Sequence, residues 1–157
     1  MKIKSFLFLL GIPVLCGCIG TAHLYPIRGP LSAQTPPPIL LGKVSGIARS
    51  GNISVTLADG ELCKGRWALV PRSPASPAAN VAANSLSSEW DTVYGPGFYV
   101  AHVLGMRFLA RAVLPGNRGT TLTVEMYKPD NAPTDASPSF IKGVAKDTKD
   151  NIYKLVF

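Results

Sequence analysis

Residues 53–70 read ISVTLADGELCKGRWALV and decide the fold class, because two segments of alternating apolar and polar residues flank a turn sequence. A two-residue turn would place Val55 opposite Lys64 and would mix apolar with charged side chains on one face. A three-residue loop that ends at Gly60, with this glycine in the left-handed conformation, instead places Val55 opposite Cys63. The sequence therefore predicts an antiparallel hairpin with the second register.

The predicted hairpin has one apolar face and one basic face. Cys63 lies on the apolar face, which Trp67 extends, and a thiol in that position behaves as a small hydrophobic side chain rather than as a nucleophile. Lys64 and Arg66 lie on the opposite face with Ser54. We therefore expect the first face in the core and the second in solvent.

Other parts of the chain show the same hairpin character. Alternating segments over 107–114 and 120–127 flank a Gly-rich turn, and segments over 143–146 and 152–157 flank another turn. The uncharged run over 98–105 is typical of a buried strand. We predict an all-β protein, in which antiparallel hairpins form a small sandwich or barrel of about six to eight strands.

The composition supports a single β domain. The chain has 157 residues, with 14 Pro and 15 Gly, and it is 46% hydrophobic but only 16% charged. The many helix-breaking residues disfavour a helical bundle, and the apolar content is too high for a disordered polyelectrolyte. We predict one antiparallel β domain over 39–157, with a flexible insert rich in Pro, Ala and Ser at 71–97.

The first residues are typical of an export signal. Two lysines precede an uncharged apolar stretch over 6–16, which is too short to cross a membrane as a helix. Residues 15–18, LCGC, resemble a bacterial lipobox, and the domain resembles other small all-β envelope lipoproteins. The resemblance implies a lipoprotein signal peptide over 1–17, cleavage before Cys18, and acyl chains such as palmitate on this cysteine, which anchor the chain in a membrane.

The same resemblance implies a place in the cell envelope. Ile19, rather than Asp, follows the lipid-bearing cysteine, which in lipoproteins of this kind implies the outer membrane. Three alternatives stay open: a signal cleaved after Ala22 that releases a secreted or periplasmic protein, an uncleaved anchor, and a disulfide or metal pair of Cys16 and Cys18.

Prolines mark the segment that follows the lipobox. Residues 18–38 contain Pro26, Pro30 and the run over 36–38, which favour an extended conformation without backbone donors. We predict a semi-rigid, lipidated tether. In the alternative, part of this segment packs on the domain through its apolar side chains, which are Leu24, Tyr25, Ile27 and Leu31.

Scattered basic residues give the chain a formal net charge of +7. If Lys64 and Arg66 share a sheet face with Arg107 and Arg111, the four side chains form a positive surface for anionic lipid headgroups, a cell-wall polymer or an acidic protein. Nucleic acid is not an expected partner of an exported protein.

An aromatic cluster lies around residues 95–97. Its members are Trp90, Tyr94, Phe98 and Tyr99. Such a cluster is typical of the edge of a core, and the alternative is a platform for a ligand, with Trp90, Tyr94 and Tyr99 as binding residues.

The sequence contains no recognisable catalytic or metal-binding motif. His102 lies in an apolar run, where a hydrogen-bonded core imidazole is expected, and an enzyme would need His102, Glu89 and Asp91 to converge in one pocket. We expect no cofactor and no metal. The sequence predicts a membrane-anchored envelope lipoprotein that acts as a structural or binding module, with a secreted β protein or a cryptic envelope enzyme as alternatives.

Overall fold

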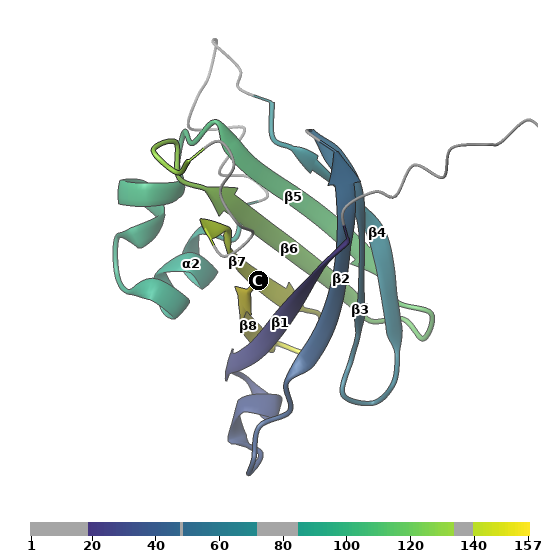
Figure 1. Ribbon diagram of the computed structural model, residues 1–157. Helices are drawn as coiled ribbons and strands as arrows, with labels where there is room; N and C mark the ends of the chain where they lie inside the picture. Colours follow the sequence, from purple (N-terminus) through teal and green to yellow (C-terminus); the bar gives the residue numbers. More distant parts are fainter. Residues whose placement is uncertain (1–18, 48, 72–84, 134–139) are drawn as a thin grey trace, which may run out of the picture.

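Eight antiparallel strands close into a barrel in chain order, so the predicted all-β fold is confirmed and the barrel is the form it takes (Figure 1). The structure is a computed structural model that describes residues 19–47, 49–71, 85–133 and 140–157. The strands are β1 (Ile19–Arg28), β2 (Leu40–Ile47), β3 (Ser50–Thr56), β4 (Leu62–Leu69), β5 (Phe108–Pro115), β6 (Thr121–Lys128), β7 (Lys142–Asp147) and β8 (Ile152–Val156). The helices are η1 (Pro30–Ala33), α2 (Ser87–Tyr94) and η2 (Tyr99–Val103).

The hairpin of β3 and β4 has the predicted register. Val55 pairs with Cys63, and Gly60 has a φ of 80°, which is the left-handed conformation that the three-residue loop requires. The Leu57 amide donates to the Glu61 carbonyl at 2.8 Å and so closes the loop. The side chain of Cys63 is fully buried, and burial raises the pKa of its thiol, as expected for a core residue.

The two later hairpins are also confirmed. β5 pairs with β6 from Phe108 to Pro115, and β7 pairs with β8 around a tight turn. Alternate residues of all eight strands fill the barrel interior. The largest fully buried members of this interior cluster are Tyr153, Leu24, Ile53, Leu114, Leu122 and Leu155.

The prediction of a tether over 18–38 is wrong, because residues 19–28 form strand β1. This strand is hydrogen-bonded to β2 on one side and to β8 on the other, and it closes the barrel. Ala22, Leu24 and Pro26 alternate as inward-facing, buried residues. Pro26 is tolerated because the register with β8 shifts just after it, at a β-bulge. Only the later prolines lie in a connection, which includes η1.

The segment between β4 and β5 differs from the prediction at its described end. Residues 87–94 of the predicted flexible insert form α2, with Glu89 and Trp90 buried, whereas residues 72–84 lie outside the described residues. The predicted strand over 98–105 is instead the π-helix η2, which buries Tyr99 and Val103 and exposes the residues between them. Both helices pack on the outer wall of the barrel, where their apolar side chains meet Leu109, Tyr127 and Val144.

The predicted signal peptide over 1–17 and the lipid-bearing Cys18 lie outside the described residues. Within the described ranges, none of the helices has the length and apolar character that a membrane crossing needs.

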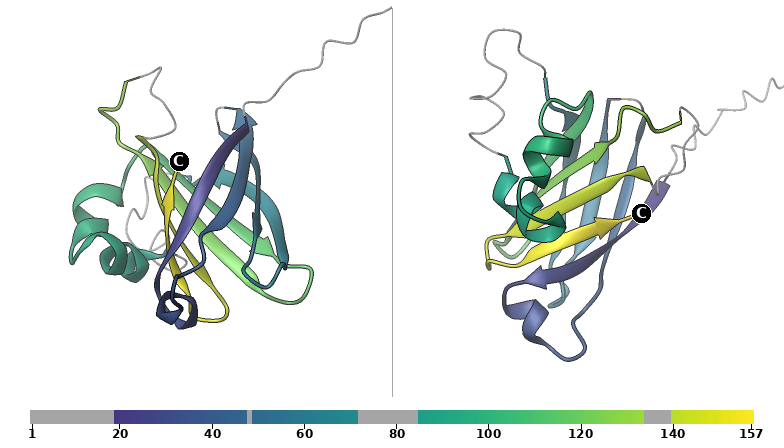
Figure 2. Two further views of the ribbon diagram at one scale, coloured as in Figure 1. Left: turned by 60° about the horizontal axis from the view of Figure 1, so that its bottom comes forward. Right: turned by 90° about the vertical axis from the view of Figure 1, so that its left-hand side faces the viewer.

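The two ends of the barrel are built differently. One end, which we call the sealed end because hydrogen-bonded loops gather there, holds three short loops, over 57–61, 116–120 and 148–151, and the connection over 29–39. A pocket of about 420 Å³ lies between this connection and the loops. The open end holds the start of β1, the turn between β2 and β3, the long connections after β4 and β6, and the C-terminus (Figure 2). An apolar cavity of about 160 Å³ opens at this second end, between Val44, Trp67, Met126 and Phe157.

A pair of glycines at the open end predicts a specific sensitivity to mutation. Gly46 faces Gly51 across β2 and β3, and the Trp67 indole lies over both and donates to the Ser45 carbonyl at 3.0 Å. A Cβ atom at Gly51 would lie 2.6 Å from Trp67 Nε1 and closer still to the Ser45 carbonyl. We expect Gly51→Ala to lower the free energy of unfolding in urea by about 2 kcal/mol.

The matched control is Gly20→Ala in β1, where the nearest atoms to a new Cβ lie 3.9 Å away. Both variants gain the same methyl group in a strand, so only the close contact differs. Equal stability of the two variants would contradict the steric role of the glycine pair.

Candidate functional site

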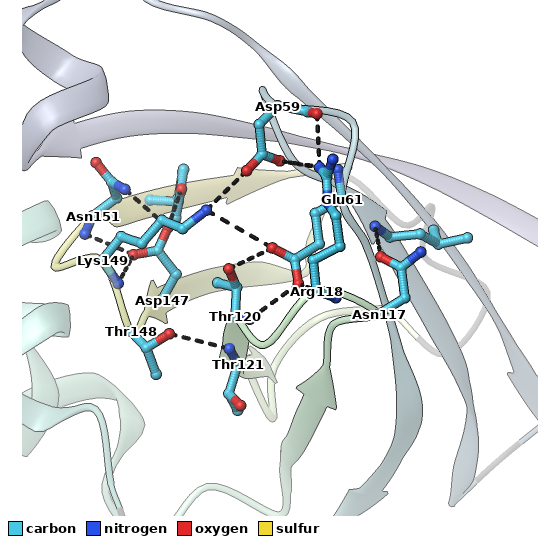
Figure 3. A network of polar contacts seen from close by, with 12 residues as sticks. Asp59, Glu61, Asn117, Arg118, Thr120, Thr121, Asp147, Thr148, Lys149 and Asn151 are labelled. Atoms are coloured by element: carbon cyan, nitrogen blue, oxygen red, sulfur yellow. Dashed lines mark hydrogen bonds and ion pairs between the residues drawn. The ribbon is translucent and has the colours of Figure 1, made fainter.

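A buried carboxylate, that of Glu61, joins the loops of the sealed end (Figure 3). Glu61 Oε1 accepts hydrogen bonds from the Arg118 amide at 2.8 Å and the Thr120 amide at 3.0 Å, and Oε2 accepts one from the Thr120 hydroxyl. The bond from the Thr120 hydroxyl is the main reason that the pKa of Glu61 is lowered, against the opposing effect of burial. The carboxylate therefore fixes the 116–120 loop to the start of β4.

Asp147 plays the same part for the last hairpin. Its Oδ1 accepts from the Lys149 and Asn151 amides at 2.8 and 2.9 Å, and its Oδ2 accepts from Asn151 Nδ2 at 2.9 Å and the Tyr153 hydroxyl at 2.6 Å. Burial, followed by the bond to this carboxylate, raises the pKa of Tyr153. Asn151 Oδ1 in turn accepts from the Leu31 amide at 2.9 Å, which holds η1 over the barrel.

An exposed ion-pair network completes this end. Asp59 accepts from Arg118 Nη2 and Lys149 Nζ, each at 2.9 Å, and the hydrogen bond from Lys149 is the main cause that lowers the pKa of Asp59 to about 2. The two buried carboxylates accept several protein donors each and so hold the loops of this end in place.

The outer wall formed by β2, β3 and β4 carries a different arrangement, which is the candidate binding site. Lys43 of β2 lies in register with Ser54 of β3 and Lys64 of β4. The adjacent outward row consists of Ser45, Asn52 and Arg66. Neighbouring strands lie about 4.8 Å apart and alternate residues about 6.7 Å apart, so the three cations surround a patch of hydroxyl and amide groups.

This wall is hollowed and lacks negative charge. A shallow pocket of about 450 Å³ lies over the two rows and is lined by Lys43, Lys64, Arg66 and the polar residues between them. The three cations, which we call the wall cations, are exposed and form no ion pair with another described residue. Cations with hydrogen-bonding groups between them favour a ligand that carries both negative charge and hydroxyl or phosphate oxygens.

The structure brings together only half of the predicted positive surface. Lys64 and Arg66 share a face as predicted, but Arg111 forms an ion pair with the buried Glu125, and its Nε donates to Glu125 Oε1 at 2.8 Å. The second oxygen of Glu125 accepts from Trp90 Nε1 at 2.8 Å. Arg107 precedes β5 at the open end and stacks on Phe108, 4.9 Å from its ring centroid.

Sequence reasoning missed Lys43, which completes the surface. Its signal was present, because Leu40, Gly42 and Val44 alternate with Leu41, Lys43 and Ser45. Only the pairing of β2 with β3 shows that Lys43 lies beside Ser54.

The predicted aromatic candidates belong mainly to the core. Trp90 is fully buried and Tyr99 is 5% exposed, so neither offers a surface to a ligand. Tyr94 is half-buried and stacks on Phe98, with ring centroids 4.7 Å apart, and the burial of its ring raises its pKa to about 12. The cluster joins α2 and η2 to the barrel wall.

The residues of the alternative enzyme hypothesis each contact other parts of the chain. Glu89 accepts from Lys146 Nζ at 3.0 Å, and Asp91 accepts from the Tyr99 amide at 2.9 Å. The expectation of a core position for His102 is wrong, since its side chain is exposed. The His102 ring contacts the Phe98 ring, with ring centroids 4.7 Å apart. His102 lines a shallow pocket that neither acid reaches. In the described part of the chain, no three His, Cys, Asp or Glu side chains are grouped to hold a metal ion.

The network of Glu61 predicts a pH-dependent stability. A carboxylate whose pKa is lower in the folded chain stabilises the fold above its ordinary pKa of 4.5, and this contribution is lost as the pH falls through the folded value. We expect Glu61→Gln to lower the urea midpoint at neutral pH, because an amide cannot accept at both ends. The difference from the wild type should shrink progressively below pH 4.5.

The control is Asp150→Asn, an exposed position with a φ of 62°, a conformation that Asn tolerates. This variant should follow the wild type at every pH. A cost of Glu61→Gln that is the same in acid and at neutral pH would contradict the role given to the ionised carboxylate.

Comparison of the chain with protein-family models, with curated proteins and with solved structures found no match.

Proposed function

We propose that this protein is a lipid-anchored binding module of a bacterial cell envelope, and that the wall of β2, β3 and β4 binds an anionic polymer. The observation that carries the proposal is the set of three wall cations around Ser45, Asn52 and Ser54, without an acidic side chain in either row. A polymer with carboxylate or phosphate groups and free hydroxyl groups matches both parts of this surface.

The position of the surface supports a polymer over a folded acidic protein. The pocket follows two rows that run across the strands, and its lining side chains are small or flexible. The larger apolar side chains that commonly anchor protein interfaces are few in these rows. The wall also lies away from α2 and η2, which pack against the other side of the barrel, so a chain can pass over it (Figure 1).

The anchor is supported by the sequence before β1. Two lysines, the apolar stretch over 6–16 and the lipobox-like residues 15–18 give the order of features that export and lipidation need. Stable attachment needs at least two acyl chains, which a lipidated cysteine with a free amine can carry.

Removal of the wall cations should weaken polymer binding. Three exposed ion pairs of about 0.5 kcal/mol each amount to roughly tenfold in Kd, so we expect this loss in the triple variant Lys43→Gln, Lys64→Gln and Arg66→Gln. Binding to dextran sulfate, measured by isothermal titration calorimetry at low ionic strength, provides the readout. Uncharged dextran is the negative control, and added salt should reduce the wild-type affinity.

A charge-matched variant separates the wall from net charge. Arg49→Gln, Arg107→Gln and Lys142→Gln remove the same three charges at exposed positions of the open end. We expect this variant to bind dextran sulfate as the wild type does. An equal loss in both triple variants would refute the wall as the site and leave only a general attraction of a basic protein.

Mass spectrometry of the mature N-terminus tests the anchor. We expect acyl mass on Cys18 in the wild type and its absence in Cys18→Ser, together with release of the variant from the membrane fraction. A mature chain that begins at His23 and carries no acyl group would replace the anchor with secretion.

A further inference from the structure

The barrel begins immediately after the cysteine that carries the proposed lipid. Ile19 is the first residue of β1 and pairs with Ser45 of β2. Adjacent α-carbons are ~3.8 Å apart, so no flexible segment separates Cys18 from the hydrogen-bonded sheet. An acyl chain on Cys18 therefore holds one particular end of the barrel, the open end, at the level of the lipid headgroups (Figure 2).

The open end has the apolar character of a surface that meets a membrane. Phe140 is 44% exposed beside Ile141, and the half-buried Phe108 and Phe157 line the mouth of the apolar cavity. A Phe ring buries apolar surface when it enters the boundary between lipid headgroups and acyl chains.

The open end carries exposed cations that suit an anionic membrane. The rim of the open end carries the described basic residues Arg49, Arg107, Lys128 and Lys142 together with Asp130, and the connection after β4 adds Asp91 and a buried Glu89 that is paired with Lys146. At the sealed end Glu61 and Asp147 are buried, and the exposed acids Asp59 and Asp150 lie among the exposed bases Arg28, Arg118 and Lys149. An anionic lipid surface attracts the exposed cations of the open end.

We propose that the open end of the barrel docks directly on an anionic lipid surface, with Phe140 among the headgroups and the sealed end pointing away. This inference rests on the lipid anchor of the proposed function. In this orientation the wall of β2, β3 and β4 does not face the membrane. The wall cations therefore stay available to a polymer in the space above the bilayer. The rim cations Arg49, Arg107 and Lys142 then bind lipid phosphates.

Spin labels at the two ends of the mature lipidated protein test this orientation. Phe140→Cys places a label at the open end and Ala58→Cys places one on the exposed loop of the sealed end. The native Cys63 is fully buried and the thiol of Cys18 is acylated, so neither competes for the label. The protein is reconstituted in vesicles of phosphatidylglycerol and phosphatidylcholine, and collisions of each label with a water-soluble nickel chelate and with oxygen are measured.

We expect the label at 140 to collide severalfold less with the nickel chelate than the label at 58, and more with oxygen. The rim variant Arg49→Gln, Arg107→Gln and Lys142→Gln should restore chelate access to the label at 140, as should vesicles of phosphatidylcholine alone. The wall variant Lys43→Gln, Lys64→Gln and Arg66→Gln, which removes the same charge, should leave the protection unchanged.

The outcomes separate this inference from the anchor itself. Equal chelate access at both positions, in a protein that carries acyl mass and stays on the vesicles, overturns the docking of the open end and leaves the anchor in place. A protein without acyl mass that does not associate with vesicles overturns the anchor and the docking together. If the wall variant, and not the rim variant, restores chelate access to the label at 140, the wall of β2, β3 and β4 faces the membrane and the proposed orientation is overturned.

Discussion

The buried carboxylate of Glu61 is the contact on which the rest of the barrel depends. The loops of the sealed end belong to different hairpins, and buried residues there such as Thr120 and Asn151 have backbone amides that need acceptors. Glu61 supplies these acceptors to Arg118 and Thr120, and Asp147 does so for the last hairpin. A neutral side chain of similar size would leave donors unpaired, so ionised acids hold the strands of distant hairpins at one level.

The loops of the sealed end determine which segments of the chain lie at the open end. The short loops and the connection over 29–39 occupy the sealed end, so the start of β1, the long connections and the C-terminus gather at the opposite one. At the open end, Trp67 lies over the two glycines beside the turn between β2 and β3, and an apolar cavity opens nearby. Hydrogen-bonded polar groups lie at one end and apolar side chains at the other, so the two ends of the barrel differ in polarity.

Local patterns predicted the hairpins, and long-range pairing decided the rest. The alternation over 53–70 and the turn at Gly60 gave the correct register of β3 and β4, because both depend on neighbouring residues. Strand β1 was missed because the prolines of residues 18–38 favoured an extended tether, and only pairing with β2 and β8 shows that a bulge accommodates Pro26. Sequence reasoning did not single out Glu61, because its partners Arg118 and Thr120 lie 57 and 59 residues away in the chain.

The positive surface of the protein follows from where its acids are used. Glu61, Glu89, Glu125 and Asp147 are all buried, and each one accepts hydrogen bonds that hold a loop, a helix or an arginine in place. These structural acids offer little charge to solvent, whereas Lys43, Lys64 and Arg66 remain exposed on the wall that α2 does not cover. The fold thus buries much of its negative charge in contacts that maintain the barrel. The exposed wall cations therefore remain available to a ligand.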